Sequence, residues 1–335
     1  MPRTLSDGPT AREAPAVRAA GPSALPLTAY RTAIALDDPV VRPTPTPTDA
    51  SPGQLDAYVR TALNLLSTDA AVPRLGLRAD TLRDLADADA TTARRVLRAL
   101  LTVRPPGPLS ADAHDAVDAV LDLERRLRTT VDVRQLPTVA EEFPGSTHQA
   151  AEHLTLWRGD ITTLAVDAIV NAANSALLGC FQPLHPCVDN AIHSAAGPRL
   201  RDDCHTVITL QGASEPTGTA KITRGHHLPA AHVLHTVGPV IHGRPAPDDA
   251  EALAAAYRAC LDLAAEVESI RTLAFCSVST GVFGYPRSEA APLALRTVSD
   301  WLVDHPGRLD RVVLNVFEPE DESVYRRALS ETPTG

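Results

Sequence analysis

The sequence predicts an α/β protein in which helices cover both faces of a central sheet. From about residue 150 to 330, short apolar segments of strand length alternate with longer segments whose apolar residues recur at helical spacing. Hydrophobic residues make up 44% of the chain and charged residues 21%, which is enough apolar material for a buried core. A helical accessory region, 53–140, and a tail, 1–52, precede the domain at 150–330.

Residues 1–52 are expected to be a disordered, proline-rich tail. They contain ten of the 29 prolines of the chain, including the stretch RPTPTPTDASPG, and show no sustained apolar periodicity. A segment of this composition buries too little apolar surface to offset the conformational entropy that it would lose on folding.

Residues 53–140 are expected to form a small helical region. The stretches QLDAYVRTALNLL and TTARRVLRALLTV carry apolar residues at helical spacing. The stretch RPPGPLS then breaks the chain before a third helix, for which Ser110 is a suitable N-cap. The sequence leaves open whether this region packs over a binding pocket or only stabilises the domain that follows.

Within 150–330, strands are expected at HLTLW, VDAIVNAAN, AKITRG, AHVLHTVG, RTLAFCSVS and RVVLNVF, and helices are expected between them. In open α/β sheets, ligands bind beyond the carboxyl ends of the strands. The loops WRGDITTL, NAANSALLGC and SVSTGVFGYP follow three of these strands and therefore form the candidate site.

The net charge and the lack of a long apolar run argue against two classes of partner, nucleic acid and a membrane. With 31 Lys and Arg against 41 Asp and Glu, the net charge of −10 argues against a broad basic surface for nucleic acid. A nucleotide ligand remains compatible with this charge, because helix N-termini and backbone N–H groups bind phosphate. The sequence has neither a signal peptide nor an apolar run of about 18 residues, so we expect a cytoplasmic protein with reduced thiols and no membrane partner.

Two cysteines and a histidine lie within eight positions, at Cys180, His185 and Cys187. In a reducing compartment, closely spaced Cys and His residues are more often metal ligands or catalytic groups than disulfide partners. Zinc accepts thiolate and imidazole ligands, and three protein ligands leave a fourth position open. The alternative is a chance meeting of two buried thiols and a surface histidine. Packing roles are expected for Cys204 and His193.

Five motifs in this order resemble the macrodomain family, which binds ADP-ribose: GDIT, VDAIVNAAN, PTGTAKIT, HVLHTVGP and STGVFGYP. The resemblance covers about residues 151 to 305 and implies a three-layer fold with a mixed central sheet. The Cys, His, Cys loop departs from the glycine-rich loop of most macrodomains and resembles the zinc-dependent branch, which hydrolyses protein-linked ADP-ribose. The helical region, with LLTVRPPGPLS, resembles the N-terminal extension of that branch.

The resemblance also implies substrate-binding residues. Asp160 would accept a hydrogen bond from the adenine amino group and Ile161 would offer backbone contacts, although an aspartate there also suits a turn or helix cap. Asn174 would orient the distal ribose, and Asn190 would add a hydrogen bond near the metal. The turn before a later helix would receive the diphosphate and enclose the distal ribose, with packing as the alternative for its tyrosine. It comprises Ser279, Thr280, Gly281, Val282, Phe283, Gly284 and Tyr285.

Asn174 and Asp189 are the candidate catalytic residues. Asp189 follows the last candidate ligand by two positions, where it can act on a water molecule or a ribose hydroxyl, or simply cap a helix. Two thiolates cancel the formal charge of Zn²⁺ and weaken its Lewis acidity. We therefore expect zinc to orient and polarise the distal ribose, with Asp189 as general base.

The expected function is zinc-dependent removal of mono-ADP-ribose from modified protein side chains, by hydrolysis at ribose C1″. Family analogy adds a sirtuin-like ADP-ribosyltransferase as a partner. Two alternatives are a reader that binds ADP-ribosylated proteins without turnover and a hydrolase of small derivatives such as O-acetyl-ADP-ribose. The Cys, His, Cys loop favours the first function, because a reader needs no open metal site.

Overall fold

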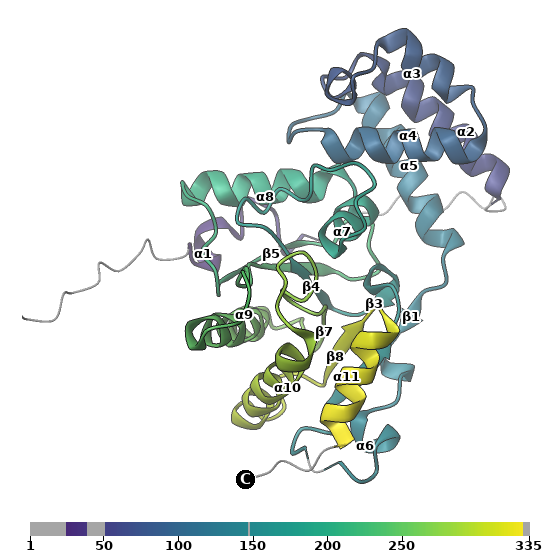
Figure 1. Cartoon of the computed structure of the whole chain (residues 1–335). Helices are drawn as coiled ribbons and strands as arrows, with labels where there is room; N and C mark the ends of the chain where they lie inside the picture. The colour runs from purple at the N-terminus through teal and green to yellow at the C-terminus, as the bar shows by residue number, and fades with distance from the viewer. Residues whose placement is uncertain (1–24, 39–50, 147, 331–335) are drawn as a thin grey trace, which may run out of the picture.

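The structure is a computed structural model that describes residues 25–38, 51–146 and 148–330. A six-stranded sheet lies at its centre between two layers of helices, which confirms the predicted three-layer α/β fold (Figure 1). The strand order is β2-β8-β7-β4-β6-β5. The strands are β2 (Leu154–Arg158), β4 (Ala168–Ala172), β5 (Ala220–Arg224), β6 (His232–Thr236), β7 (Thr272–Phe275) and β8 (Arg311–Val316).

The sheet is mixed, as expected. The pairs β2–β8, β8–β7, β7–β4 and β4–β6 are parallel, and only the edge strand β5 of this sheet runs antiparallel to its neighbour β6. Because β4 and β7 are parallel neighbours, the loops that follow them leave the same edge of the sheet next to each other. The candidate site therefore has its two main loops side by side.

Helices α7 (Val188–Ala196) and α8 (Pro198–Gln211) lie on one face of the sheet, and α9 (Pro247–Ala265), α10 (Arg287–Asp304) and α11 (Pro319–Ser330) lie on the other (Figure 1). The helical stretch that begins near Cys187 is divided at Gly197, whose φ is +88°, and Pro198 then starts α8. Among the described residues, no helix is both long and apolar enough to cross a membrane.

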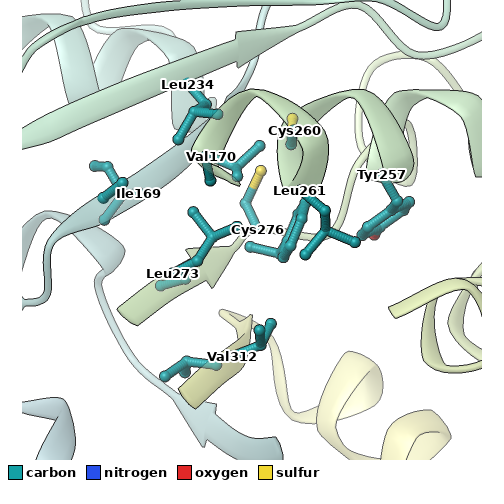
Figure 2. Close-up of a cluster of buried hydrophobic side chains, with 14 of the residues drawn as sticks. Ile169, Val170, Leu234, Tyr257, Cys260, Leu261, Leu273, Cys276 and Val312 are labelled. Atoms are coloured by element: carbon teal, nitrogen blue, oxygen red, sulfur yellow. The ribbon is translucent and has the colours of Figure 1, made fainter. Parts of the chain in front are cut away.

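The main hydrophobic core lies between the sheet and the helices on both of its faces, since it includes Ile192 of α7 as well as Leu261 of α9. Figure 2 shows Val170 of β4 and Leu234 of β6 near Cys260 and Leu261 of α9, and all four side chains are buried. Cys276, which follows β7, is buried in the same core. Cys260 and Cys276 are therefore both core residues.

Four helices form a bundle with its own core, which runs from Leu55 to Leu123 and is separate from the core of the α/β domain. The hydroxyl of Ser110 accepts a hydrogen bond from the Ala113 N–H at 3.4 Å, so Ser110 is the N-cap of the last helix. This helical unit consists of α2 (Pro52–Leu65), η1 (Leu66–Thr68), η2 (Val72–Leu75), α3 (Ala79–Ala86), α4 (Ala90–Val103) and α5 (Ala111–Leu127).

The helical unit ends near Leu127, before the expected boundary at residue 140. The segment that follows contributes Val133 and Val139 to the core of the α/β domain. A two-stranded sheet also ties it there, because β1 pairs in parallel with β3. The elements concerned are β1 (Val131–Asp132), η3 (Val133–Gln135), α6 (Val139–Glu142), η4 (Ile161–Thr163) and β3 (Leu164–Ala165).

Residues 25–38 correct the prediction that 1–52 is wholly a disordered tail. This segment contains α1 (Leu27–Tyr30), and its apolar side chains belong to the core of the α/β domain. The Tyr30 hydroxyl accepts a hydrogen bond from the Ile222 N–H on the edge strand β5 at 3.1 Å. The segment has too few apolar residues to show a helical or strand period in the sequence, but enough to pack against the surface of the folded α/β domain. Residues 1–24 and 39–50 lie outside the described residues.

Replacing Tyr30 by Phe should lower the free energy of unfolding by about 1–3 kcal/mol, because the buried Ile222 N–H would lose its acceptor. Chemical denaturation of the full chain measures this loss. The matched control is Tyr58→Phe, whose hydroxyl accepts from Gln54 at 2.9 Å in a half-buried position where water can replace it. The control should cost about 0.5 kcal/mol or less. Equal losses would show that the Tyr30 contact contributes no more than a surface contact.

Candidate active site at the ends of strands β4 and β7

Two loops from neighbouring strands form the candidate site. Residues 173–187 connect β4 to α7, and residues 276–286 connect β7 to α10. Phe283 of the second loop packs against a small apolar cluster that includes Ala173 and Leu177 of the first loop. The two loops therefore contact each other beyond the edge of the sheet.

The first loop brings Cys180, His185 and Cys187 together. One ligand atom of each residue lies within 4.8 Å of the others, and the Cys180 Sγ is 3.6 Å from the His185 Nδ1. All three side chains are half-buried. Two sulfur atoms and one imidazole nitrogen are ligands that zinc prefers, so the residues present fit this metal.

Cys187 also forms the start of α7. Its Sγ accepts a hydrogen bond from the Asn190 N–H at 3.4 Å, which makes it the N-cap of the helix. Burial raises the pKa of the Cys187 thiol to about 11. A thiolate at this position therefore needs a cation beside it, and binding of a metal would release the proton.

Asp189 is buried in the first turn of α7. Its Oδ1 accepts a hydrogen bond from the Asn171 Nδ2 at 2.7 Å. Burial raises the pKa of Asp189 to about 6, and the Asn171 hydrogen bond opposes that rise. The alternative that Asp189 caps the helix is wrong, because Cys187 does so. The side chain of Asn171 thus holds the candidate base.

A second group of histidine and cysteine side chains lies beside Asp189. His193, Cys204 and His235 are buried, and their ligand atoms lie within 4.8 Å of one another. Among the described residues, neither ring nitrogen of His193 has a hydrogen-bond partner, and its Nε2 is 3.5 Å from the Asp189 Oδ1. Burial lowers the pKa of His235 to about 3 and that of His193 well below its usual value. Asp189 therefore has neutral imidazoles for neighbours.

Asn174 holds the first loop in a tight turn. Its Nδ2 donates to the Gly179 carbonyl at 3.1 Å, and its Oδ1 accepts from a backbone N–H two residues along the chain at 3.0 Å. Gly179 has φ +83°, and a Cβ atom there would lie 3.0 Å from the His193 ring. Leu177 and Leu184 also have positive φ, so the loop stores backbone strain. In this structure the Asn174 amide shapes the loop; its role toward a ribose stays a prediction.

Asp160 caps the short helix η4 after β2. Its Oδ1 accepts from the Thr162 N–H at 2.9 Å and from the Thr162 hydroxyl at 2.7 Å. The Asp160 side chain is exposed at the same edge of the sheet, whereas Ile161 is buried. Helix η4 packs against α7, which brings this third loop toward the other two. Capping and ligand binding are compatible here, because the cap uses one carboxylate oxygen.

The turn at residues 279–285 combines strain with a buried hydroxyl. Ser279 has φ +64°, and among the described residues its hydroxyl has no hydrogen-bond partner. Gly238 lies so close that a Cβ atom on it would be 2.0 Å from the Ser279 Oγ. A buried polar group without a partner beside a strained turn is typical of a ligand site.

The other residues of this turn differ in exposure. Val282 is 74% exposed and Phe283 is half-buried, so both border the site. Tyr285 is part of the main core, which agrees with the packing alternative. The remaining residues, Thr280, Gly281 and Gly284, form the turn itself, in which the Gly284 N–H donates to the Gly281 carbonyl at 3.0 Å.

Asn190 is buried in α7 and links the loop before that helix to α4. Its Nδ2 donates to the His185 carbonyl at 2.9 Å, and its Oδ1 accepts from the Thr102 hydroxyl of α4 at 3.4 Å. Sequence analysis did not single out Thr102 or Arg201. Thr102 lies inside the stretch LLTVRPPGPLS, which drew attention only as a family resemblance, and the one sequence signal for Arg201 is its proximity to the break at Gly197.

The helical unit packs behind α7. Helices α4 and α5 contact α7, and Figure 1 shows the bundle beside α7 and α8. A cavity of about 30 Å³, enough for one or two water molecules, lies in this contact and borders Asn190, His193 and Arg201. Its lining includes none of residues 279–285. The helical unit is thus placed to support the loop of Cys180, His185 and Cys187 from behind.

Comparison with known proteins agrees with this architecture. The Macro domain family model matches residues 170–294. The protein-ADP-ribose hydrolase of Treponema medium is 44% identical over 235 residues, which are 70% of this chain and 87% of the relative. The protein-ADP-ribose hydrolase of Staphylococcus aureus (strain MRSA252) is 43% identical over 235 residues, which are 70% of this chain and 83% of that protein.

A solved structure leads to the same family. The Trypanosoma brucei macrodomain in complex with ADP-ribose is 34% identical, with a TM-score of 0.53, and the match covers 66% of this chain and 91% of that one. The motifs, the mixed sheet and these similarities agree: the chain belongs to the Macro domain family.

Proposed function

We propose that this chain is a hydrolase that removes mono-ADP-ribose from modified protein side chains, with zinc held by Cys180, His185 and Cys187. One observation carries the proposal: a loop with two thiols and an imidazole lies next to the buried carboxylate of Asp189, at the carboxyl ends of β4 and β7. The similarity to proteins named protein-ADP-ribose hydrolase supports the reaction, and the similarity to a macrodomain in complex with ADP-ribose supports the ligand.

Zinc, when bound, would supply a Lewis-acidic centre with one open coordination position. Asp189 accepts a proton from the attacking water and then delivers it to the released side chain. In the hydrolysis, water adds across the bond between ribose C1″ and the side-chain atom, so that the hydroxyl group goes to C1″ and a proton goes to the released side chain. Asn171 orients the Asp189 carboxylate for this transfer through its hydrogen bond at 2.7 Å.

The adenosine and the diphosphate supply binding energy away from the reacting carbon. The exposed carboxylate of Asp160 meets the adenine, with backbone contacts from Ile161, and the turn that begins at Ser279 receives the diphosphate. Binding energy gained at these remote groups can position the reacting centre. The sirtuin-like partner and the cytoplasmic location stay predictions.

Metal removal tests the whole proposal. Stripping the purified chain of metal should abolish its release of ADP-ribose from a mono-ADP-ribosylated protein, and about one zinc per chain should restore it. Unchanged activity after verified zinc loss would remove the metal from the mechanism. Binding of ADP-ribose without turnover in either state would make the chain a reader, and turnover of O-acetyl-ADP-ribose alone would make it a small-molecule hydrolase.

Replacing Cys180 or Cys187 by Ala should lower kcat by about 100-fold and change the Kd for ADP-ribose by about 3-fold or less, because residues other than the metal ligands bind adenosine and diphosphate. Single-turnover kinetics and calorimetric titration measure the two effects. Cys260→Ala is the control, since it removes a buried thiol from α9 outside the loop. Equal losses of turnover and affinity would mean that the metal only holds the pocket together.

Replacing Asp189 by Asn should lower kcat by about 10²–10⁴-fold while the zinc content stays unchanged, because the amide cannot accept the proton. Asp167→Asn serves as the control, since the Asp167 carboxylate accepts hydrogen bonds from the Arg271 and Thr272 N–H groups at the opposite edge of the sheet. Comparable kcat losses in the two variants would make Asp189 a structural residue.

A further inference from the structure

Arg201 of α8 is a buried arginine with 6% of its surface exposed. Its guanidinium donates from Nε to the Leu178 carbonyl at 2.8 Å and from Nη1 to the Leu101 carbonyl at 3.0 Å and to the Arg104 carbonyl. Leu178 belongs to the loop that carries the metal ligands, whereas Leu101 and Arg104 belong to the end of α4 in the helical unit. One guanidinium therefore joins the loop to the helical unit.

The end of α4 explains how a positive charge can be buried at this place. A helix leaves its last carbonyl groups without partners inside the helix, and the partial negative charge there favours a cation. Arg201 binds two of these carbonyls at the end of α4. Burial lowers the pKa of Arg201, but the α4 carbonyls supply the acceptors that water would otherwise provide.

The same guanidinium contacts the loop at a second point. It lies over the ring of Phe181, with its central carbon 4.6 Å from the ring centroid, which is a cation–π contact. Phe181 directly follows Cys180, and Leu178 precedes Cys180 by two residues. Arg201 thus holds the backbone on one side of the first metal ligand and a side chain on the other.

Two further contacts lead from the same part of the helical unit toward the loop. The Thr102 hydroxyl of α4, whose shorter hydrogen bond goes to the Arg98 carbonyl, also lies 3.4 Å from the Asn190 Oδ1. Asn190 in turn donates to the carbonyl of His185, the second candidate ligand. The turn that follows α4 also docks on α8, because the Gly107 N–H donates to the Asp202 carboxylate at 2.8 Å. Gly107 lies in the RPPGP stretch that sequence analysis singled out.

We propose that Arg201 is a positioning residue for the metal site: it fixes the loop that holds Cys180, His185 and Cys187 against the end of α4, and the helical unit is part of that site's support. The inference rests on the proposed function in so far as it takes this loop to bind zinc. Groups that orient metal ligands without touching the metal change metal affinity by about 10–100-fold when they are removed.

The test compares Arg201→Met and Arg201→Lys with the same two substitutions at Arg308. Arg308 is a matched control, because its guanidinium binds carbonyls at the end of α9, away from the loop. The four acceptors are the carbonyls of Ala264, Ala265, Val267 and Ile270. Three quantities are measured on the full chain: the Kd for Zn²⁺ by competition with a chelator, the absorption spectrum of the Co²⁺-substituted protein, and the Tm.

We expect Arg201→Met to raise the Kd for Zn²⁺ by about 10–100-fold and to shift the Co²⁺ bands that report thiolate ligation. Arg201→Lys should give a smaller loss, because lysine keeps the charge but not the planar fork that reaches separate carbonyls. The Arg308 variants should lower the Tm and leave the Kd for Zn²⁺ within about 3-fold of the unchanged chain. If Arg201→Met does not fold, the Arg201→Lys result decides, with an expected rise in Kd of about 3-fold or more.

The outcomes separate this inference from the proposed function. If the unchanged chain binds no zinc at the loop, the zinc site of the proposed function fails and the inference fails with it. If the unchanged chain binds zinc and the Arg201 variants keep its affinity and its Co²⁺ spectrum, the inference alone is overturned and Arg201 only stabilises the fold. Equal effects of the Arg201 and Arg308 variants on zinc affinity would also overturn it.

Discussion

The parallel pairing of β4 with β7 is the constraint on which the site depends. The two strands align Ala168 with Leu273 and Val170 with Phe275, and these side chains are buried. A shift of one residue in this register would turn the buried side chains to the other face of the sheet, so the core enforces the alignment. The loops that follow the strands must then start at neighbouring points, which places the Cys, His, Cys loop next to the strained turn at Ser279.

The first loop is held in a conformation that its own residues do not favour. Leu177 and Leu184 have positive φ, and each such residue costs about 1–3 kcal/mol unless its surroundings compensate. Compensation comes from three directions: the Asn174 amide inside the loop, Asn190 from α7, and Arg201 from α8 together with the end of α4. A loop supported in this way needs little rearrangement to bind the zinc ion that we propose, and the proposed support comes in part from the helical unit.

The strand positions and the helical unit follow from local patterns, because strand and helix periods are properties of consecutive residues. The mixed sheet was expected from the family resemblance alone. The errors arose where packing with distant segments decided the outcome. Residues 25–38 pack on the α/β domain through the contact of Tyr30 with the edge strand β5. No hydrophobic period in this segment predicts that contact. The helical region ends near Leu127 because Val133 and Val139 enter the other core, and the sequence does not reveal which of two cores will receive an apolar side chain.

The sequence by itself determined the chemical types at the site: two thiols and an imidazole at close spacing, a carboxylate two residues later, and glycine-containing turns after predicted strands. Only the tertiary structure decided what each group does there. In the folded chain, Cys187 is the helix N-cap, and Asp189 is buried and accepts a hydrogen bond from Asn171. Arg201 donates hydrogen bonds to the Leu178 carbonyl and to the Leu101 carbonyl, which is 100 residues away in the sequence. The reason is physical: residue type and spacing set local conformation, whereas hydrogen bonds between distant segments exist only after the two cores have packed together.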